Sequence, residues 1–562
     1  MKKTFALFIV CGLSLTCLFA GNKNPNLKEI EDGVFTISAI DKDAAVKYKQ
    51  TYDTFKDVTI VNGEKNKKNN PITVNLADFE NKEVYIEFSC DIKVENPDNS
   101  EIELIWMIND LDAGLPTLVD KKVSVGKWIH LEGETAIPLG ANKSFYLSGA
   151  GINITKTNFY IKNFLLRFTG DNLGKNPPAP VDWKTVPSLK EAYAPYFTFG
   201  IACELGPELA KKGVQDGIAY HAASVTPGNE FKPDSVFNFA HPQNQNYIDF
   251  IAEDGKIYKM PDKMPGFGKI KPFLLTAKKL GVKVRGHVLV WHSQTPKWFF
   301  KEDFSSQANA AYVDKATMNA RMEWYIKEVL SYIDKVEKEN NNGEHIVYSW
   351  DVVNEAIADG AGDIKWLRED SDWYKVYGDE SFIINAFRYA NKYAPSDVTL
   401  CYNDYSCYSP AKRKAICKLI DEIKACPDAR IDAVGMQSHV KMTTPVTGPN
   451  SYEEAVETFL SHGVNVQVTE LDIANDNKAY SSIMLKAKYK EYFKLFLKHR
   501  AKEGIPGITG VTIWGVSDNR TWLNNQKEYQ GHTQYPLLFN EDYSVKQAYY
   551  GVLEAVKFAD SE

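Results

Sequence analysis

The sequence predicts an α/β protein in which a (β/α)8 TIM barrel follows an all-β sandwich domain. Between residues 25 and 172, polar and apolar residues alternate with a period of two, and no long helical pattern interrupts them. Between residues 187 and 557, apolar strand-like runs alternate instead with helix-like segments. Residues 173–186, rich in Gly, Asn and Pro, separate these regions and are typical of an exposed linker.

Two long alternating segments support the N-terminal domain. KEVYIEFSCDIKV (82–94) and TNFYIKNFLLRF (157–168) direct apolar side chains to one face and polar side chains to the other. Turn-rich pieces such as ENPDNS (95–100) separate strands of this kind. Because a strand that is apolar on one face must bury that face against another layer, we expect a β-sandwich over residues 25–172.

Eight strand-like runs support the barrel. Helix-like segments such as SFIINAFRYANKYA (381–394) lie between them, and parallel strands require such crossover helices. A doubly wound open sheet is the alternative, but no G-x-G-x-x-G turn follows the first run. In chain order the runs are FTFGIA, IAYHAASV, VKVRGHVLVW, VYSWDVVN, DVTLCYND, IDAVGMQS, NVQVTELD and ITGVTIWG.

The first twenty residues have the pattern of a secretory signal peptide. Residues 1–3 (MKK) are a basic start, and an apolar run continues from Phe5 to Ala20. This run is too short to favour a membrane-spanning helix, and no later segment has that character. We expect cleavage after about Ala20 and a secreted, periplasmic or cell-surface protein. Lipid anchoring at Cys17 is the alternative, although the preceding residues 15–16 (LT) fit such a cleavage site poorly.

Charge and cysteine content argue against several classes of protein. The 66 basic and 73 acidic residues give a net charge of −7, and no basic stripe is visible, so we expect no nucleic-acid partner. No C-x-x-C pair is present, so the cysteine spacing is not that of a zinc site. A large core does not need a disulfide framework. A bridge stays open among Cys401, Cys407, Cys417 and Cys426.

Polar side chains follow seven of the eight predicted strands. In a (β/α)8 barrel, the carboxyl ends of the strands meet at one mouth, which holds the active site. That mouth would collect carboxylates, amides, imidazoles and indoles. From the second strand to the eighth they are Asn229, Glu230 and Lys232; His287, Trp291, His292 and Gln294; Asn354 and Glu355; Asn403, Asp404 and Tyr405; Gln437 and His439; Glu470 and Asp472; Trp514, Ser517, Asp518 and Trp522.

This inventory fits the hydrolysis of a glycosidic bond. One carboxylic acid must protonate the leaving oxygen, while a second carboxylate acts as nucleophile or base. Amides, imidazoles and lysine can hydrogen-bond sugar hydroxyl groups, and indole faces can pack against sugar rings. The motifs H-E-x-x-H and G-x-S-x-G, which indicate other hydrolases, do not occur in the sequence.

Six segments resemble those of glycoside hydrolase family 10 and occur in the order seen in that family. They are GHVLVWHSQTPKWF, WDVVNEAI, YNDY, IDAVGMQSHV, VTELDI and TIWGVSD, and the resemblance covers residues 187–557. It implies endo-β-1,4-xylanase activity on a (β/α)8 barrel, with retention of configuration by double displacement. The implied partners are xylan and xylo-oligosaccharides, and the implied mechanism needs no metal and no cofactor.

The resemblance also implies roles for single residues. Glu355 resembles the general acid/base, Glu470 the nucleophile, and Asn354 the amide that hydrogen-bonds the sugar 2-hydroxyl group. The residues expected to orient or tune these glutamates are His439 and Asp472 for the nucleophile and Gln437 for the acid/base. The residues expected to bind sugar are Asn229, Lys232, His287, Trp291 and Gln294 on the glycone side, Tyr405 on the leaving-group side, and Trp514 and Trp522 along the walls.

Two segments depart from the family pattern. Many members read E-N-E-M-K-W where this chain reads GNEFKPD. Gly228 therefore replaces a sugar-contacting carboxylate, and Pro233 replaces a tryptophan. Ser406 replaces an asparagine that is common after N-D-Y. We expect weaker affinity for distal glycone sugars and an altered leaving-group side.

The N-terminal domain resembles a jelly-roll carbohydrate-binding module, such as those of families 4 and 22, through the segment TNFYIKNFLLRF. A structural spacer is the alternative. Trp106, Trp128 and Tyr146 are candidate sugar platforms, although buried packing is the commoner role of such rings.

Two other functions compete for the barrel. One is a β-glucanase on the same scaffold, and the other is a binding protein that has lost turnover. The presence of both carboxylates argues against the second. We expect the protein to be a monomer.

Overall fold

The structure is a computed structural model, and the chain divides into two compact units, Met1–Pro180 with Asn477–Lys488 and Val181–Asp476 with Tyr489–Glu562. The predicted signal peptide (1–20), its Cys17 and residues 173–179 of the predicted linker lie outside the described residues. None of the helices in the described part of the chain has the length and apolar character needed to cross a membrane. The described residues are 27–31, 34–37, 50–53, 58–62, 72–75, 84–109, 117–137, 144–148, 158–169 and 180–559 without 238–245, 265, 476–481 and 531.

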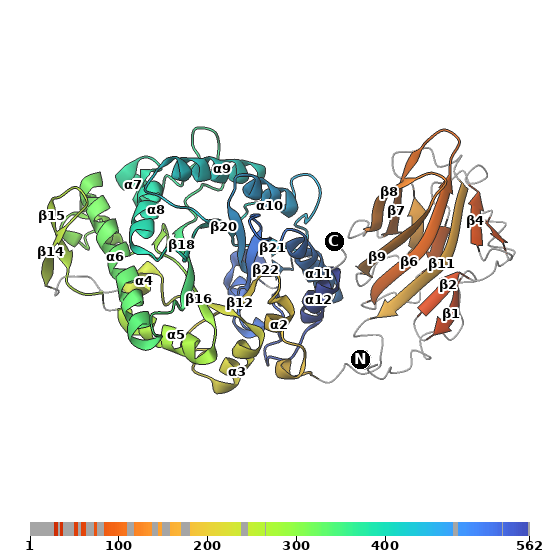
Figure 1. Cartoon of the computed structure of the whole chain (residues 1–562), viewed down its shortest axis with the longest axis horizontal. Helices are drawn as coiled ribbons and strands as arrows, with labels where there is room; N and C mark the ends of the chain where they lie inside the picture. The colour runs from red at the N-terminus through yellow and green to blue at the C-terminus, as the bar shows by residue number, and fades with distance from the viewer. Residues whose placement is uncertain are drawn as a thin grey trace. The chain divides into compact units, whose positions relative to one another are not determined.

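Up to residue 169, the described part of the first unit is all-β, as predicted, and its strands pair antiparallel in two sheets (Figure 1). The larger sheet is centred on β11, which pairs with β2, β4 and β6, and the smaller has the order β5-β10-β7-β8. In β6, Cys90, Ile92 and Val94 are buried, whereas Asp91 and Lys93 between them are half-buried, which is the predicted alternation. The bounds are β1 Leu27–Glu31, β2 Val34–Ile37, β3 Gln50–Asp53, β4 Val58–Asn62, β5 Ile72–Asn75, β6 Val84–Glu95, β7 Glu101–Asn109, β8 Thr117–Ser124, β9 Trp128–Ile137, β10 Ser144–Ser148 and β11 Asn158–Thr169.

The second unit is a closed parallel barrel, as predicted. The strand order is β16-β13-β12-β23-β22-β20-β19-β18, and β18 pairs back to β16, which closes the ring. β17 pairs with β18 beyond β16, and β21 pairs with β22 beyond β20, so ten strands occupy eight barrel positions. The bounds are β12 Thr198–Cys203, β13 Ser224–Pro227, β16 Lys283–Gly286, β17 Val290–Trp291, β18 Val347–Asn354, β19 Thr399–Asp404, β20 Ala433–Met436, β21 His439–Lys441, β22 Asn465–Ala474 and β23 Ile508–Ile513.

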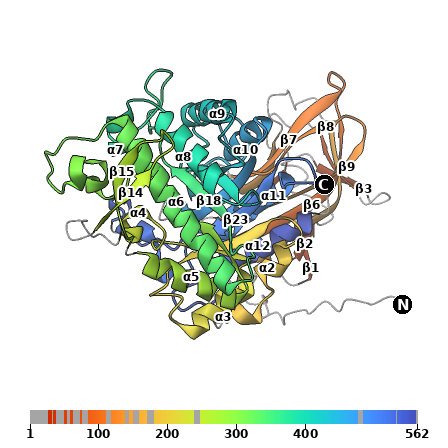
Figure 2. The ribbon, with the colours of Figure 1, turned by 60° about the vertical axis from the view of Figure 1, so that its left-hand side comes forward.

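Helices surround the barrel strands, as Figures 1 and 2 show from two directions. A hairpin of β14 (Tyr247–Ile251) and β15 (Ile257–Pro261) is added after the second strand. The helix bounds are α2 Leu189–Tyr193, α3 Lys212–His221, α4 Pro233–Val236, α5 Phe267–Leu280, α6 Lys315–Asn340, α7 Asp372–Tyr377, α8 Ser381–Tyr393, α9 Pro410–Ala425, α10 Tyr452–Ser461, α11 Ser482–Lys498 and α12 Gln547–Ala555.

The second predicted strand, IAYHAASV, is wrong over its first half. Ile218 and His221 belong to α3, and β13 begins only at Ser224. The two side chains lie one helical turn apart and are both fully buried, and Nε2 of His221 lies 2.7 Å from the carbonyl oxygen of Trp183. Burial on one face of a helix therefore produced an apolar run that could equally be interpreted as a strand.

The cysteines show no bridge. Every cysteine of the described residues is a free thiol, including Cys401, Cys407, Cys417 and Cys426, among which a disulfide had stayed open.

Candidate active site

A cavity of about 400 Å³ lies at the carboxyl ends of the barrel strands. All of the residues that line it were predicted from the sequence as site residues. Of the residues to which the family resemblance assigns a role, Asn229 and Asp472 lie outside the lining. Asn229 contacts the lining residue Lys232, and Asp472 contacts the lining residue His439. The lining residues are Lys232, His287, Trp291, Gln294, Asn354, Glu355, Tyr405, Gln437, His439, Glu470, Trp514 and Trp522.

Glu355 follows the last residue of β18 and has a positive φ of 55°. Left-handed backbone is unusual for a residue with a side chain and needs support from its surroundings. The Glu355 N–H donates to the Asn403 carbonyl at 2.9 Å. Its carboxylate accepts from Nε1 of Trp291 at 2.9 Å and from Nε2 of Gln437 at 2.7 Å. Both donors are neutral side chains.

Glu470 lies within β22 and is buried. Oε1 accepts from Nδ2 of Asn403 at 2.8 Å, and Oε2 accepts from Nε2 of His439 at 3.2 Å. Burial by itself would raise the pKa of Glu470, but the hydrogen bond from His439 and the electrostatic interaction with His287 outweigh it and lower the pKa to about 2. Glu470 is therefore a carboxylate at neutral pH.

His439 connects Glu470 with a second carboxylate. Its Nδ1 lies 2.9 Å from Oδ2 of Asp472, which also accepts from Nε1 of Trp522 at 2.8 Å. Burial by itself would lower the pKa of His439, but the charge of Asp472 and the hydrogen bonds to both carboxylates raise it to about 10. An imidazolium donates from both nitrogens, which matches an acceptor on each side.

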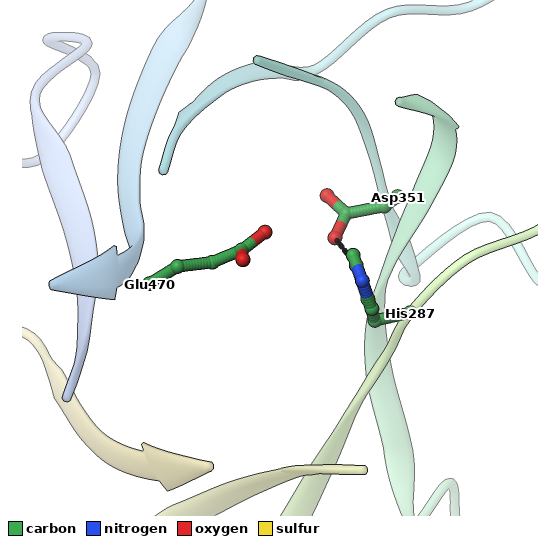
Figure 3. A group of neighbouring side chains, drawn as sticks. All are labelled: His287, Asp351 and Glu470. Carbon is green, nitrogen blue, oxygen red and sulfur yellow. Dashed lines mark hydrogen bonds and ion pairs between the residues drawn. The ribbon is translucent and has the colours of Figure 1, made fainter. Parts of the chain in front are cut away.

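A buried ion pair between Arg285 and Asp351 fixes the imidazole of His287. Its Nδ1 lies 2.8 Å from Asp351, and both oxygens of Asp351 accept from the guanidinium of Arg285 at 2.5 Å. Figure 3 shows Glu470 extending toward His287 and Asp351 from the opposite strand. Ligand atoms of these three residues lie within 4.8 Å of one another, a spacing that could hold a metal ion. A cation there would have to compete with the guanidinium for Asp351, so the donor set suits an ion pair better than a metal.

Asn403 hydrogen-bonds both Asn354, next to Glu355, and Glu470, a role that the sequence did not predict. Its Nδ2 donates to Oδ1 of Asn354 at 3.0 Å as well as to Glu470, and its Oδ1 accepts from Oγ1 of Thr469 at 2.7 Å. Nε2 of Gln437 lies 3.1 Å from the same oxygen of Asn354. Asn403 had been noted only as a strand end, and that position was the available signal.

The residues predicted to bind glycone sugars form a connected set of polar groups. Oδ1 of Asn229 accepts from Nζ of Lys232 at 3.2 Å, and Nδ2 of Asn229 donates to Oε1 of Glu204 at 2.7 Å. Burial lowers the pKa of Lys232, opposed by nearby carboxylates, Glu470 first among them. A Cβ at Gly228 would lie 3.0 Å from Cγ of Glu204. The space next to Gly228 is thus occupied by a carboxylate from a different loop.

Tyr405, which is predicted to contact sugar on the leaving-group side, is held by several neighbours. Its hydroxyl accepts from Nη2 of Arg368 at 2.9 Å and contacts Asp359. Nζ of Lys412 lies 3.5 Å from the ring centroid, which is a cation–π contact. Ser406, the departure noted from the family pattern, has a positive φ of 50° directly after this tyrosine. The tyrosine is therefore fixed at both its hydroxyl group and its ring.

Two carboxyl groups with different partners, at the mouth of a (β/α)8 barrel and among amides and indoles, define the class of glycoside hydrolases. The chain belongs to glycosyl hydrolase family 10, whose family model matches residues 188–555. The chain spans about a third to a half of the length of the first curated relatives it matches.

Relatives and solved structures extend this comparison. A bifunctional endo-1,4-β-xylanase of Ruminococcus flavefaciens is 37% identical over 371 residues, covering 66% of this chain and 34% of that protein. A putative endo-1,4-β-xylanase of Caldicellulosiruptor saccharolyticus is 36% identical, covering 56% of this chain and 96% of that protein. The CBM22-1 and GH10 modules of a Clostridium thermocellum endo-1,4-β-D-xylanase, solved with xylohexaose, match with a TM-score of 0.54 and 27% identity over 89% of this chain and 90% of that chain.

Proposed function

We propose that this chain is a secreted endo-β-1,4-xylanase that hydrolyses internal bonds of xylan with retention of configuration. The observation that carries the proposal is the contrast between Glu355, held by two neutral donors, and Glu470, held as an anion by His439. A retaining glycosidase needs this pair of one proton donor and one ionised nucleophile. The relatives are endo-1,4-β-xylanases and one matched structure holds xylohexaose, which supports xylan as the substrate.

In the first step, Glu470 attacks the anomeric carbon while Glu355 protonates the leaving oxygen. The glycosidic bond breaks, a glycosyl ester forms on Glu470, and the proton of Glu355 leaves with the aglycone. Asn354 is placed beside Glu470 through Asn403, so it can hydrogen-bond the sugar hydroxyl nearest the reacting carbon. Lys232, Gln294 and Asn229 bind the sugars farther out on the glycone side.

In the second step, Glu355 is a carboxylate and takes a proton from water, which hydrolyses the ester. Oε1 and Oε2 of Glu355 keep their donors, Gln437 and Trp291, so the group stays in place while its charge changes. Glu470 leaves as the carboxylate that His439 favours. Two displacements at one carbon return the original configuration.

The test is the release of reducing sugar from xylan by the full chain and by Glu470→Ala. The proposal expects release by the wild type and its loss in the variant. Proton NMR of the first product is expected to show the β anomer. An inactive wild type, an active Glu470→Ala or an α product would overturn it. A higher rate on carboxymethyl cellulose than on xylan would instead identify a β-glucanase.

For the N-terminal domain we propose xylan binding as a carbohydrate-binding module. Its two-sheet architecture and the match that extends over the CBM22-1 module support this assignment. Among the candidate platforms, Trp128 at the start of β9 is 41% exposed. Affinity electrophoresis in soluble xylan is expected to retard the full chain carrying Glu470→Ala. Trp128→Ala is expected to weaken the retardation, and unchanged mobility of both proteins would leave only a spacer.

Secretion with residues 1–20 as signal peptide belongs to the same proposal. Mass spectrometry of the mature protein is expected to show an N-terminus shortly after Ala20. A lipid-modified Cys17 at the N-terminus would identify the anchored form instead. Light scattering is expected to show a monomer.

A further inference from the structure

The backbone directly after Glu355 is held by a single side-chain oxygen. The N–H groups of Ala356 and Ile357 both donate to the hydroxyl of Tyr402, each at 3.1 Å. Tyr402 lies on β19, next to β18, and is fully buried. Since the two amides come right after a residue with a positive φ, their acceptor helps to keep the chain in that conformation.

The hydroxyl of Tyr402 is itself oriented. It donates to Oδ2 of Asp404 at 2.5 Å, and Oδ1 of Asp404 pairs with Nζ of Lys412 at 2.7 Å and accepts from the N–H of Tyr405 at 2.9 Å. Burial raises the pKa of Asp404 to about 6 although Lys412 opposes it, so the group is mainly a carboxylate at neutral pH. A phenol that donates to a carboxylate is a better acceptor for its other partners.

The position of the Glu355 carboxyl group depends on this turn. Its two donors come from other parts of the barrel, Trp291 from the end of β17 and Gln437 from the residue directly after β20. Other hydrogen bonds of this segment include Glu355 N–H to the Asn403 carbonyl, the Arg368 side chain to the Glu355 carbonyl at 3.1 Å, and the Arg368 N–H to the Ala356 carbonyl at 2.9 Å. Without an acceptor for two buried amides, the turn would relax to satisfy them elsewhere.

We propose that Tyr402, oriented by Asp404 and Lys412, is a positioning residue for proton transfer by Glu355. It touches no substrate and no reacting atom, and it acts through the backbone of Ala356 and Ile357. The inference rests on the proposed function of Glu355 as acid/base. It assigns a role to a side chain that lies outside the cavity lining and outside the predicted site.

The test is Tyr402→Phe, which removes one oxygen atom and keeps the ring. Two aryl β-xylobiosides are compared, one with a good leaving group (dinitrophenol) and one with a poor leaving group (phenol). Because only the poor leaving group needs a well-placed acid in the first step, kcat/KM is expected to fall about tenfold or more on phenyl xylobioside and much less on the dinitrophenyl compound. KM for phenyl xylobioside is expected to stay unchanged. Asp404→Asn, which weakens the orientation of the hydroxyl, is expected to show the same selectivity to a smaller degree.

The matched control is Tyr193→Phe. Tyr193 is also fully buried, and its hydroxyl donates to the carbonyl oxygen of Val552 at 2.6 Å, away from the cavity. This variant is expected to lose stability without leaving-group selectivity. Equal losses on both xylobiosides in Tyr402→Phe, or no loss, would overturn the inference, and Asp404→Asn decides in the same way if Tyr402→Phe does not fold. A wild type inactive on both compounds would instead defeat the proposed function.

Discussion

Asn403 donates to Glu470 at 2.8 Å although their strands are not neighbours. Asn403 lies on β19 and Glu470 on β22, and β20 runs between these strands. The amide therefore crosses β20 on the inside of the barrel at Gly435, where a Cβ would lie 2.3 Å from Oδ1 of Asn403. The absence of a side chain at Gly435 is what allows this contact.

Gly435→Ala is expected to displace Asn403 and to weaken its bonds to Glu470 and Asn354. Overpacking of this kind costs about 1–3 kcal/mol in the free energy of unfolding. We also expect a lower kcat on xylan, because both site residues lose a donor. Urea unfolding and initial rates measure the two effects. Gly268→Ala in α5 is the control, since nothing lies within 4 Å of its Cβ, and it is expected to leave kcat unchanged. An active, fully stable Gly435→Ala would contradict the crossing.

His439→Asn is expected to move the acid limb of kcat/KM to higher pH. Burial raises the pKa of Glu470, and the variant removes the hydrogen bond and charge that now lower it to about 2. Removal of one such donor is expected to reduce kcat about 100-fold. A pH–rate profile on an aryl xylobioside measures both changes. The control is His462→Asn, whose imidazole pairs with Asp421 at 2.9 Å and does not line the cavity. An unmoved acid limb would refute this role of His439.

The pair of Glu470 and His439 also predicts how stability depends on pH. The folded pKa of Glu470, about 2, lies below its usual 4.5, so its contribution is present above pH 4.5 and is lost as pH falls toward 2. The folded pKa of His439, about 10, lies above its usual 6.5, so its contribution is complete below pH 6.5 and is lost as pH rises through 10. The Tm difference between wild type and His439→Asn is therefore expected to be largest between pH 4.5 and 6.5. Thermal unfolding at pH 3, 5.5 and 9 would reveal a constant difference if the pair did not titrate in this way.

Arg285→Met is expected to destabilise the barrel, because it leaves Asp351 buried without its cation. Breaking a buried pair in this way costs about 3–5 kcal/mol. We expect kcat to fall as well, since Asp351 orients His287 at 2.8 Å. The double variant Arg285→Met/Asp351→Leu is expected to regain stability but not activity. Recovery of full activity in the double variant would show that His287 does not need this ion pair.

Much of the site could be predicted from sequence, because a parallel barrel brings the carboxyl ends of its strands together independently of the conformation of its loops. Asn354 and Glu355 end one strand, and Glu470 lies in another, and the structure brings all three into one cavity. The second strand was placed incorrectly. The apolar run that contains Ile218 and His221 fits a strand, but it also fits the buried face of a helix, which is where these residues lie. The sequence showed that Gly228 replaces a carboxylate of the family pattern. It did not show that Glu204 lies beside Gly228, because Glu204 belongs to a different loop and no local pattern predicts where that loop lies.

The sequence by itself determined which chemical groups meet at the barrel mouth, since alternation and strand order decide that much. Only the tertiary structure decided how those groups are held. Asn403 reaches Glu470 across Gly435, and Tyr402 holds the turn after Glu355 from a neighbouring strand. Such contacts depend on differences of less than an ångström between segments distant in the chain. The charge of Glu470 likewise depends on residues of other strands, His439 first and Asn403 among them, because in a buried site the nearest donors decide whether a carboxylate keeps its proton.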